Sequence, residues 1–129
     1  MKKLIILVSH YQKLAVVLKE YLTKMIPQDP QNVEIEALGG INEGQDLGTE
    51  PFKILEAIEK HPEISDVLIF GDLGSAILSA ESIKIMAADK NIYISKGSLV
   101  ENSFSAYVLA NAGASFEEVI KASEEDIYK

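Results

Sequence analysis

Two side chains that could do chemistry, His10 and Asp72, each follow a short apolar run, at residues 4–8 and 67–70. A neutral imidazole is a nucleophile near neutral pH. A carboxylate that accepts one ring N–H fixes the imidazole tautomer, leaves the other ring nitrogen free to attack, and stabilises the positive charge that develops. If the two side chains meet, they predict a catalytic pair in which His10 carries a phosphoryl group.

A transferred phosphoryl group needs hydrogen-bond donors for its three equatorial oxygens. Backbone N–H groups at the starts of helices can supply them, and glycines let the backbone approach closely. Hydroxyl groups add further donors. The residues expected to bind or support the phosphoryl group in this way are Ser9, Gly39, Gly40, Thr49, Gly74 and Ser75.

Simpler interpretations of these residues stay open at this point. A histidine after a strand is commonly a cap or a surface residue, and Asp72 could be only a helix N-cap. The glycines between residues 39 and 48 could be turn formers, since they match neither GxxxxGK[ST] nor GxGxxG. His61 is predicted to be a surface cation at a helix end. No HExxH, GxSxG or clustered metal ligands occur, so no metal or cofactor is predicted.

Composition narrows the possible partners. The chain has 129 residues, is 47% hydrophobic and 25% charged, and carries a formal net charge of −8. These values fit one globular domain, and the acidic balance argues against nucleic acid as a partner. The absence of cysteine excludes disulfides and thiolate chemistry. No apolar stretch is long enough for a membrane span, and the cytoplasm is the expected location.

The apolar pattern alternates between strands and helices. Continuous apolar runs predict buried strands, and three- and four-residue spacing predicts helices. The expected strands are residues 3–9, 33–38, 67–71 and 91–95, and the expected helices are 11–25, 50–60, 75–88 and 103–112, with a last helix capped by Ser115.

Strict alternation predicts an α/β fold: a three-layer, doubly wound, mainly parallel four-stranded sheet of flavodoxin-like type. The two fully apolar strands, 3–9 and 67–71, should be central neighbours, which gives the order 2-1-3-4. The alternating run 33–38 should be an edge strand. Because the order reverses between the first and third strands, His10 and Asp72 should face each other there.

Three local features are also expected. Thr49 should be the N-cap of the second helix, with Pro51 in its first turn. The polar tail 124–129 should fray. The first helix should present one apolar face, formed by Leu14, Val17, Leu18, Tyr21, Leu22 and Met25.

Motifs spread over residues 3–120 resemble one family, the mannose-type enzyme IIA phosphocarrier domains of the bacterial phosphotransferase system. The chain looks most like the phosphocarrier subunit of the phosphotransferase-dependent dihydroxyacetone kinase. Ser98, Asn102 and Tyr11 depart from that pattern. The matching pieces are IILVSH (5–10), Gly39-Gly40, Gly48-Thr49, GDLGSA (71–76) with Ser79, Ala80 and Glu81, and LVE (99–101).

The resemblance implies a phosphotransferase subunit. His10 would accept a phosphoryl group from the carrier protein HPr, with Asp72 holding the imidazole. It would pass the group to ADP on the nucleotide-binding subunit of the kinase. The resemblance also implies a homodimer of single-domain chains (1–129) that needs no metal on this subunit.

Two alternatives remain beside this assignment. One is a sugar-transporting IIA domain that donates to a IIB domain, although the wording of residues 72–76 favours the kinase subunit. The other is a non-catalytic binding module in which His10 is structural.

Overall fold

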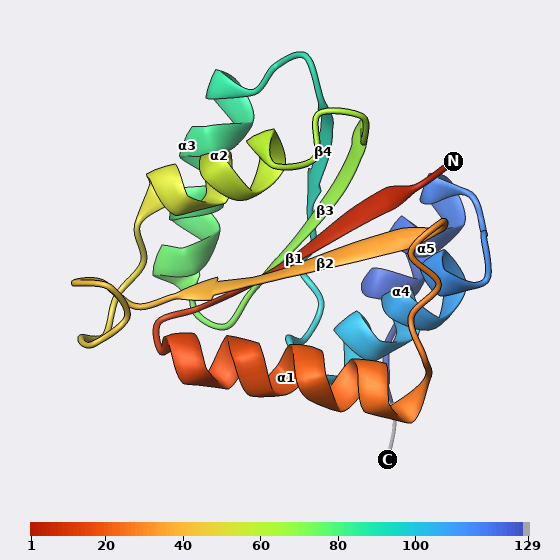
Figure 1. Ribbon diagram of the computed structural model, residues 1–129, viewed down its shortest axis with the longest axis horizontal. Helices are drawn as coiled ribbons and strands as arrows, with labels where there is room; N and C mark the ends of the chain where they lie inside the picture. The colour runs from red at the N-terminus through yellow and green to blue at the C-terminus, as the bar shows by residue number, and fades with distance from the viewer. Residues whose placement is uncertain (128–129) are drawn as a thin grey trace.

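A computed structural model describes residues 1–127. Its centre is one parallel sheet in the order β2-β1-β3-β4, which confirms the predicted α/β topology (Figure 1). The strands are β1 (Lys3–Ser9), β2 (Val33–Gly39), β3 (Asp66–Gly71) and β4 (Asn91–Ile94). Within the described residues β2 pairs only with β1, so the expected edge position of the second strand is also confirmed.

Helices cover both faces of the sheet and complete three layers (Figure 1). One face carries α1, α4 and α5, and the other carries α2 and α3. The helices are α1 (Gln12–Met25), α2 (Pro51–Glu59), α3 (Gly74–Met86), α4 (Glu101–Asn111) and α5 (Phe116–Ser123).

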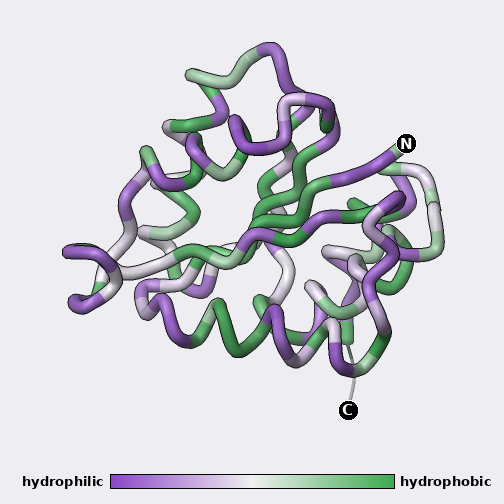
Figure 2. Tube along the Cα trace, viewed as in Figure 1, coloured by the Kyte–Doolittle hydropathy of each residue, from purple (hydrophilic) through white to green (hydrophobic). Residues whose placement is uncertain are grey.

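The central strands form because their side chains have apolar partners on both sides. Every residue of β1 is buried, and successive side chains alternate between the two faces. Ile5 and Leu7 pack under α1 and α4, whereas Ile6 and Val8 pack under α2 and α3. In Figure 2 the central strands are largely green, whereas green and purple residues alternate along the helices that surround them.

The helices α2 and α4 begin at other residues than the sequence predicted. The N-cap of α2 is Glu50, so the expected cap role of Thr49 is wrong, although Pro51 does lie in the first turn. The helix α4 begins at Glu101, two residues before the predicted start at Ser103. Ser115 caps α5 as predicted, in a reciprocal capping box with Glu118.

The apolar face predicted for α1 is only partly buried. Ala15, Leu18 and Leu22 pack on the sheet. The exposed remainder consists of Leu14, Val17, Tyr21 and Met25. Residues one position apart lie about 100° apart around a helix, so the spacing had joined two neighbouring stripes of which the sheet covers only one.

The start of the polar tail is held by hydrogen bonds. The carboxylate of Glu124 accepts hydrogen bonds from the hydroxyl of Tyr93 at 2.8 Å and from the backbone N–H of Lys96 at 2.9 Å. Residues 128–129 lie outside the described part of the chain, so the expected fraying is not tested there. Within residues 1–127, no helix combines the length and apolar character that crossing a bilayer requires.

Candidate functional site

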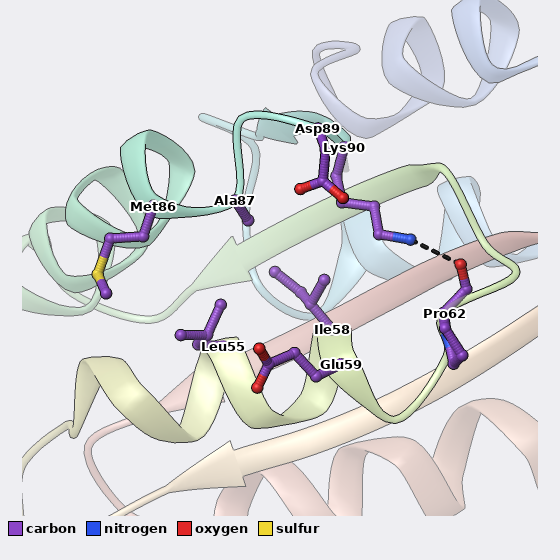
Figure 3. Close-up of a pocket in the computed structure, with 8 residues that line it drawn as sticks. All are labelled: Leu55, Ile58, Glu59, Pro62, Met86, Ala87, Asp89 and Lys90. Atoms are coloured by element: carbon purple, nitrogen blue, oxygen red, sulfur yellow. Dashed lines mark hydrogen bonds between the residues drawn. The ribbon is translucent and has the colours of Figure 1, made fainter.

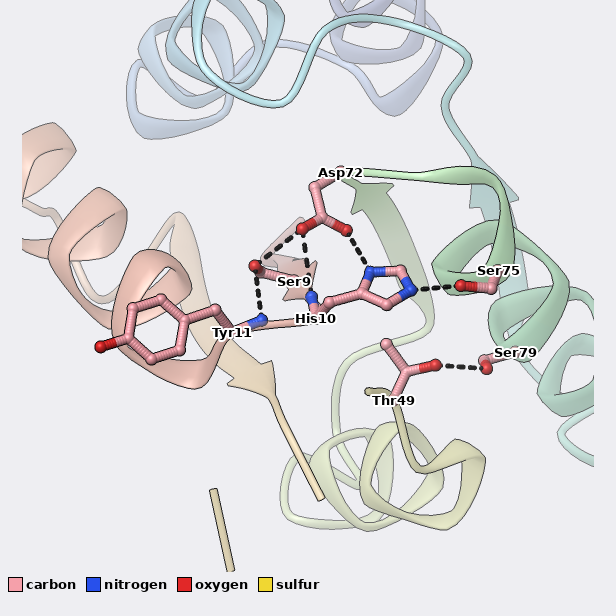
Figure 4. Close-up of polar contacts among 7 residues, drawn as sticks. All are labelled: Ser9, His10, Tyr11, Thr49, Asp72, Ser75 and Ser79. Atoms are coloured by element: carbon pink, nitrogen blue, oxygen red, sulfur yellow. Dashed lines mark hydrogen bonds and ion pairs between the residues drawn. The ribbon is translucent and has the colours of Figure 1, made fainter. Parts of the chain in front are cut away.

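His10 and Asp72 meet where the strand order reverses, at the carboxyl ends of β1 and β3. Nδ1 of His10 lies 2.9 Å from Oδ1 of Asp72 (Figure 4). The backbone N–H of Asp72 bonds to the carbonyl of Val8 at 3.1 Å, which continues the β1–β3 pairing up to the site. The sheet itself therefore sets the distance between the two side chains.

The Asp72 carboxylate accepts hydrogen bonds at both oxygens. While Oδ1 faces the imidazole, Oδ2 accepts from the hydroxyl of Ser9 at 2.8 Å and from the backbone N–H of His10 at 3.1 Å. Burial raises the pKa of Asp72, but the hydrogen bonds from His10 and Ser9 outweigh burial and hold that pKa below its ordinary value. Asp72 is therefore an anion at neutral pH. It is not the N-cap of α3, a position that Leu73 occupies.

The pairing fixes which imidazole nitrogen carries the proton. An ionised carboxylate only accepts hydrogen bonds, so Nδ1 of the neutral ring is the protonated nitrogen and Nε2 keeps its lone pair. Nε2 is hydrogen-bonded to the hydroxyl of Ser75, which in this tautomer is the donor. Ser75 is exposed, so this side of the ring is open to solvent.

The backbone of His10 is held from two directions. Its carbonyl accepts a hydrogen bond from the N–H of Gly48 at 2.8 Å, which ties it to the long loop before α2. The next N–H, of Tyr11, donates to the buried hydroxyl of Ser9 at 3.0 Å. Ser9 thus supports the site from beneath. These contacts leave the imidazole little freedom to move relative to Asp72.

Thr49 lies beside the imidazole, on the same side as Ser75 (Figure 4). Its hydroxyl is 2.9 Å from the hydroxyl of Ser79. We gave Ser79 no chemical role from the sequence. Its four-residue spacing from Ser75 was the available signal, because residues i and i+4 lie on one face of a helix.

The three glycines predicted to support the phosphoryl group, Gly39, Gly40 and Gly74, have different structural roles. A Cβ at Gly39 would lie 2.1 Å from the carbonyl oxygen of Ser9, so this glycine is required for β2 to pass β1. Gly40 has a φ of +74°, which favours glycine where the loop leaves β2. Gly39 therefore shapes the backbone beside Ser9, and Gly40 shapes the loop beside Gly44 and Asp46. By contrast, a Cβ at Gly74 would meet nothing within 4 Å, so open space surrounds the start of α3.

The start of α3 offers unused donors next to Nε2. Its N-cap, Leu73, has no capping side chain, and the N–H groups of Ala76 and Ile77 both bond to the Leu73 carbonyl. Within residues 1–127, the backbone N–H groups of Gly74 and Ser75 make no hydrogen bond. Free N–H groups at a helix start favour an anion.

Within residues 1–127, no basic side chain other than His10 is bonded to the site residues. All 12 basic residues of the sequence are lysines. In the described part of the chain, no lysine forms a hydrogen bond or ion pair with His10, Asp72, Thr49 or Ser75. The same residues contain no cluster of three or more histidine, aspartate or glutamate side chains placed to hold a metal ion.

His61 lies apart from this site, and its side chain is less exposed than the surface position that the sequence suggested. Its Nε2 is 2.8 Å from the carboxylate of Glu36 on β2, and its side chain is 16% exposed. Lys60 approaches the same carboxylate at 3.5 Å. The histidine therefore ties the end of α2 to the edge strand.

A separate cleft of about 300 Å³ lies between the C-terminal ends of α2 and α3 (Figure 3). Leu55, Ile58 and Met86 line it. The amine of Lys90 donates to the carbonyls of Pro62 and Ile64, at 2.9 and 2.8 Å. Because α3 runs back from the carboxyl edge of the sheet, this cleft is at the opposite edge from His10.

Comparison with known proteins identifies the family. The family model described as PTS system fructose IIA component, EIIA-man, matches residues 4–120. The crystal structure of the unknown-function protein EF1359 superposes with a TM-score of 0.88 at 30% sequence identity, and covers 100% of this chain and 98% of the other.

Curated relatives point the same way. The phosphotransferase subunit DhaM of the PTS-dependent dihydroxyacetone kinase of Lactococcus lactis is 35% identical over 115 residues, covering 89% of this chain and 88% of the relative. The corresponding DhaM of Listeria innocua, named a phosphoryl donor subunit, is 33% identical and 93% covered. The Escherichia coli DhaM is 33% identical, but this chain spans only 25% of its length. The chain therefore belongs to the mannose-type IIA family of the phosphotransferase system.

Proposed function

We propose that this chain is a phosphohistidine carrier, a phosphotransferase component that works in the cytoplasm and whose residues 1–129 form one phosphocarrier domain. His10 would accept a phosphoryl group from HPr and pass it to ADP on the nucleotide-binding subunit of dihydroxyacetone kinase. The observation that carries the proposal is the pairing of Nδ1 with Asp72 while Nε2 lies beside Ser75 at the start of α3. The DhaM relatives, which are named as phosphoryl donor subunits of that kinase, supply the substrate class.

The proposed step conserves electrons and protons. The Nε2 lone pair of His10 forms a bond to phosphorus, and the P–N bond to the donor histidine breaks, returning its electron pair to the donor ring. The His10 ring keeps its Nδ1 proton and becomes positively charged, and the Asp72 carboxylate stabilises that charge. Transfer to ADP repeats the step with a phosphate oxygen as the nucleophile.

Neutral donors would hold the phosphoryl oxygens. The Ser75 hydroxyl, released from Nε2 when the N–P bond forms, can donate to one oxygen. The free N–H groups of Gly74 and Ser75 and the hydroxyl of Thr49 supply others. Neutral donors suit a carrier, because very strong binding of the phosphoryl group would oppose its onward transfer.

The surroundings of His10 favour a protein donor over a small one. Large exposed apolar side chains lie next in sequence to site residues: Tyr11 after His10, Leu73 after Asp72, and Leu78 before Ser79. Apolar side chains grouped near a site are suited to contact with a protein partner. Since no lysine within residues 1–127 bonds to the site and the chain lacks arginine, positive charge facing the phosphoryl group would be supplied by the partner. A carrier protein such as HPr meets both requirements.

A homodimer is the proposed assembly, as the family resemblance implies. The exposed stripe of α1, made of Leu14, Val17, Tyr21 and Met25, supports it. Tyr21 and Met25 border a cleft of about 210 Å³ shared with Val100 and Phe104 around the start of α4. A second copy of the chain would cover this apolar surface.

Replacing His10 tests the carrier function directly. With enzyme I, HPr and ³²P-labelled phosphoenolpyruvate, wild-type protein should acquire an acid-labile, base-stable label, and His10→Ala should acquire none. The chain has only 2 histidines, so His61→Ala is a matched control that should be labelled like the wild type. Label that persists on His10→Ala would refute the assignment.

The Asp72→Asn variant tests the role of the carboxylate. The asparagine oxygen would stay with the Ser9 and His10 backbone donors, which turns its NH₂ toward Nδ1 and moves the ring proton to Nε2. We expect an unchanged circular dichroism spectrum and at least ~100-fold slower phosphoryl acceptance, measured by rapid quench. Asp89→Asn, on the exposed surface, is the control. A wild-type rate for Asp72→Asn would show that Asp72 has only a structural role.

Two exposed residues of α3 test the docking surface. Leu78 lies beside the site and is 71% exposed, whereas Ile85 lies near the far end of the same helix and is 81% exposed. Leu78→Ser should raise the KM for phosphorylated HPr about fivefold or more with little change in kcat, and Ile85→Ser should change neither. Equal kinetics for the two variants would contradict docking around His10.

The oligomeric state tests the α1 surface. At micromolar concentration, light scattering coupled to gel filtration should give twice the mass of one chain. Val17→Glu places a charge in the middle of the stripe and should yield the monomer, whereas Ile85→Glu should remain dimeric. A monomeric wild type would remove the proposed dimer, and a dimeric Val17→Glu would move the interface elsewhere.

A further inference from the structure

The hydroxyl groups of Thr49 and Ser79 form a pair beside the imidazole. The proposed transfer step uses Thr49 but gives Ser79 no role. Thr49 lies just before α2, and Ser79 lies one turn after Ser75 on α3, so the two residues come from different elements. Their oxygens are 2.9 Å apart. Figure 4 shows that the hydroxyls of Ser75, Thr49 and Ser79 all lie on the side of the imidazole that carries Nε2.

The Thr49–Ser79 pair has one O–H group that is not used in the hydrogen bond between the two residues. Each hydroxyl has one proton and can accept two hydrogen bonds. The contact between Thr49 and Ser79 uses one of the two protons, and within residues 1–127 neither hydroxyl makes another hydrogen bond. One O–H therefore remains available for an anion at Nε2.

We propose that Ser79 is a positioning residue that orients the Thr49 hydroxyl toward a phosphoryl group on His10. Ser79 donates to Oγ1 of Thr49, and Thr49 in turn donates to a phosphoryl oxygen. This direction is favoured because phosphoryl oxygens only accept, and because each donation in such a chain strengthens the next. The inference rests on the proposed carrier function.

The role of Ser79 follows from the freedom that Thr49 would otherwise have. Rotation about χ1 exchanges the hydroxyl and the methyl group of a threonine. Thr49 is not a helix cap, so no backbone group of α2 holds its hydroxyl. Among described residues the only hydrogen bond of that hydroxyl is to Ser79, which turns Oγ1 toward α3 and the Nε2 side of the ring. Without Ser79, the methyl group could take that place.

A double-mutant cycle measures the coupling. Thr49→Val removes the hydroxyl while keeping the shape, and should lower the kcat of phosphoryl acceptance from HPr about tenfold with little change in KM. Ser79→Ala should lower it about fivefold, and the double variant should be no slower than Thr49→Val. Ser79→Thr restores a hydroxyl and should recover the rate. Ser82→Ala, one turn-length further along α3, is the control.

The same samples separate a positioning role from a merely structural one. Thermal unfolding of Ser79→Ala should match that of Ser82→Ala if the pair acts on the phosphoryl group. Wild-type kcat for Ser79→Ala, or slow-downs of the two single variants that multiply in the double variant, would overturn the proposal. Failure of the wild type to be labelled would instead refute the carrier function on which it rests.

Discussion

The contact between His10 and Asp72 depends on one constraint, the parallel pairing of β1 with β3. These strands place their carboxyl ends side by side. The side chain that follows β1 and the side chain that follows β3 can therefore contact each other directly. The remaining contacts refine this arrangement. Ser9 anchors the carboxylate from below, and Gly48 fixes the backbone of His10 from the loop. Hydrogen bonds therefore hold the pair in place without a partner, which would limit the reorganisation that the proposed transfer requires.

The central part of this arrangement was accessible from the sequence for a physical reason. A strand buried on both faces is apolar along its middle, and only two of the four strands have such a continuous apolar run, at residues 4–8 and 67–70. Their adjacency fixed the strand order and so the meeting of residues 10 and 72. The edge strand was equally readable, because one wetter face leaves alternate positions free to be polar.

Other features could not be predicted from the sequence, because they depend on which neighbouring element a side chain contacts in the folded chain. The apolar spacing of α1 is real, but spacing does not say which stripe the sheet covers, and Val17 and Tyr21 are 53% and 54% exposed. Thr49 has the residue type and position of an N-cap, yet a hydroxyl on α3 lies within reach and binds it instead. His61 follows a helix, where solvent is the default, and only the position of β2 reveals its carboxylate partner.

The absence of arginine has a consequence for how partners could tell a loaded carrier from an empty one. The chain has a net charge of −8, and no lysine of the described residues forms an ion pair within the site. A phosphoryl group bound to Nε2 would add negative charge to the surface potential, offset in part by the positive charge of the His10 ring. Long-range attraction would then be stronger for a basic acceptor approaching the loaded form, and the spent form would release it more readily. Phosphorylation of His10 would thus change the electrostatic potential around the whole molecule without any change in the backbone.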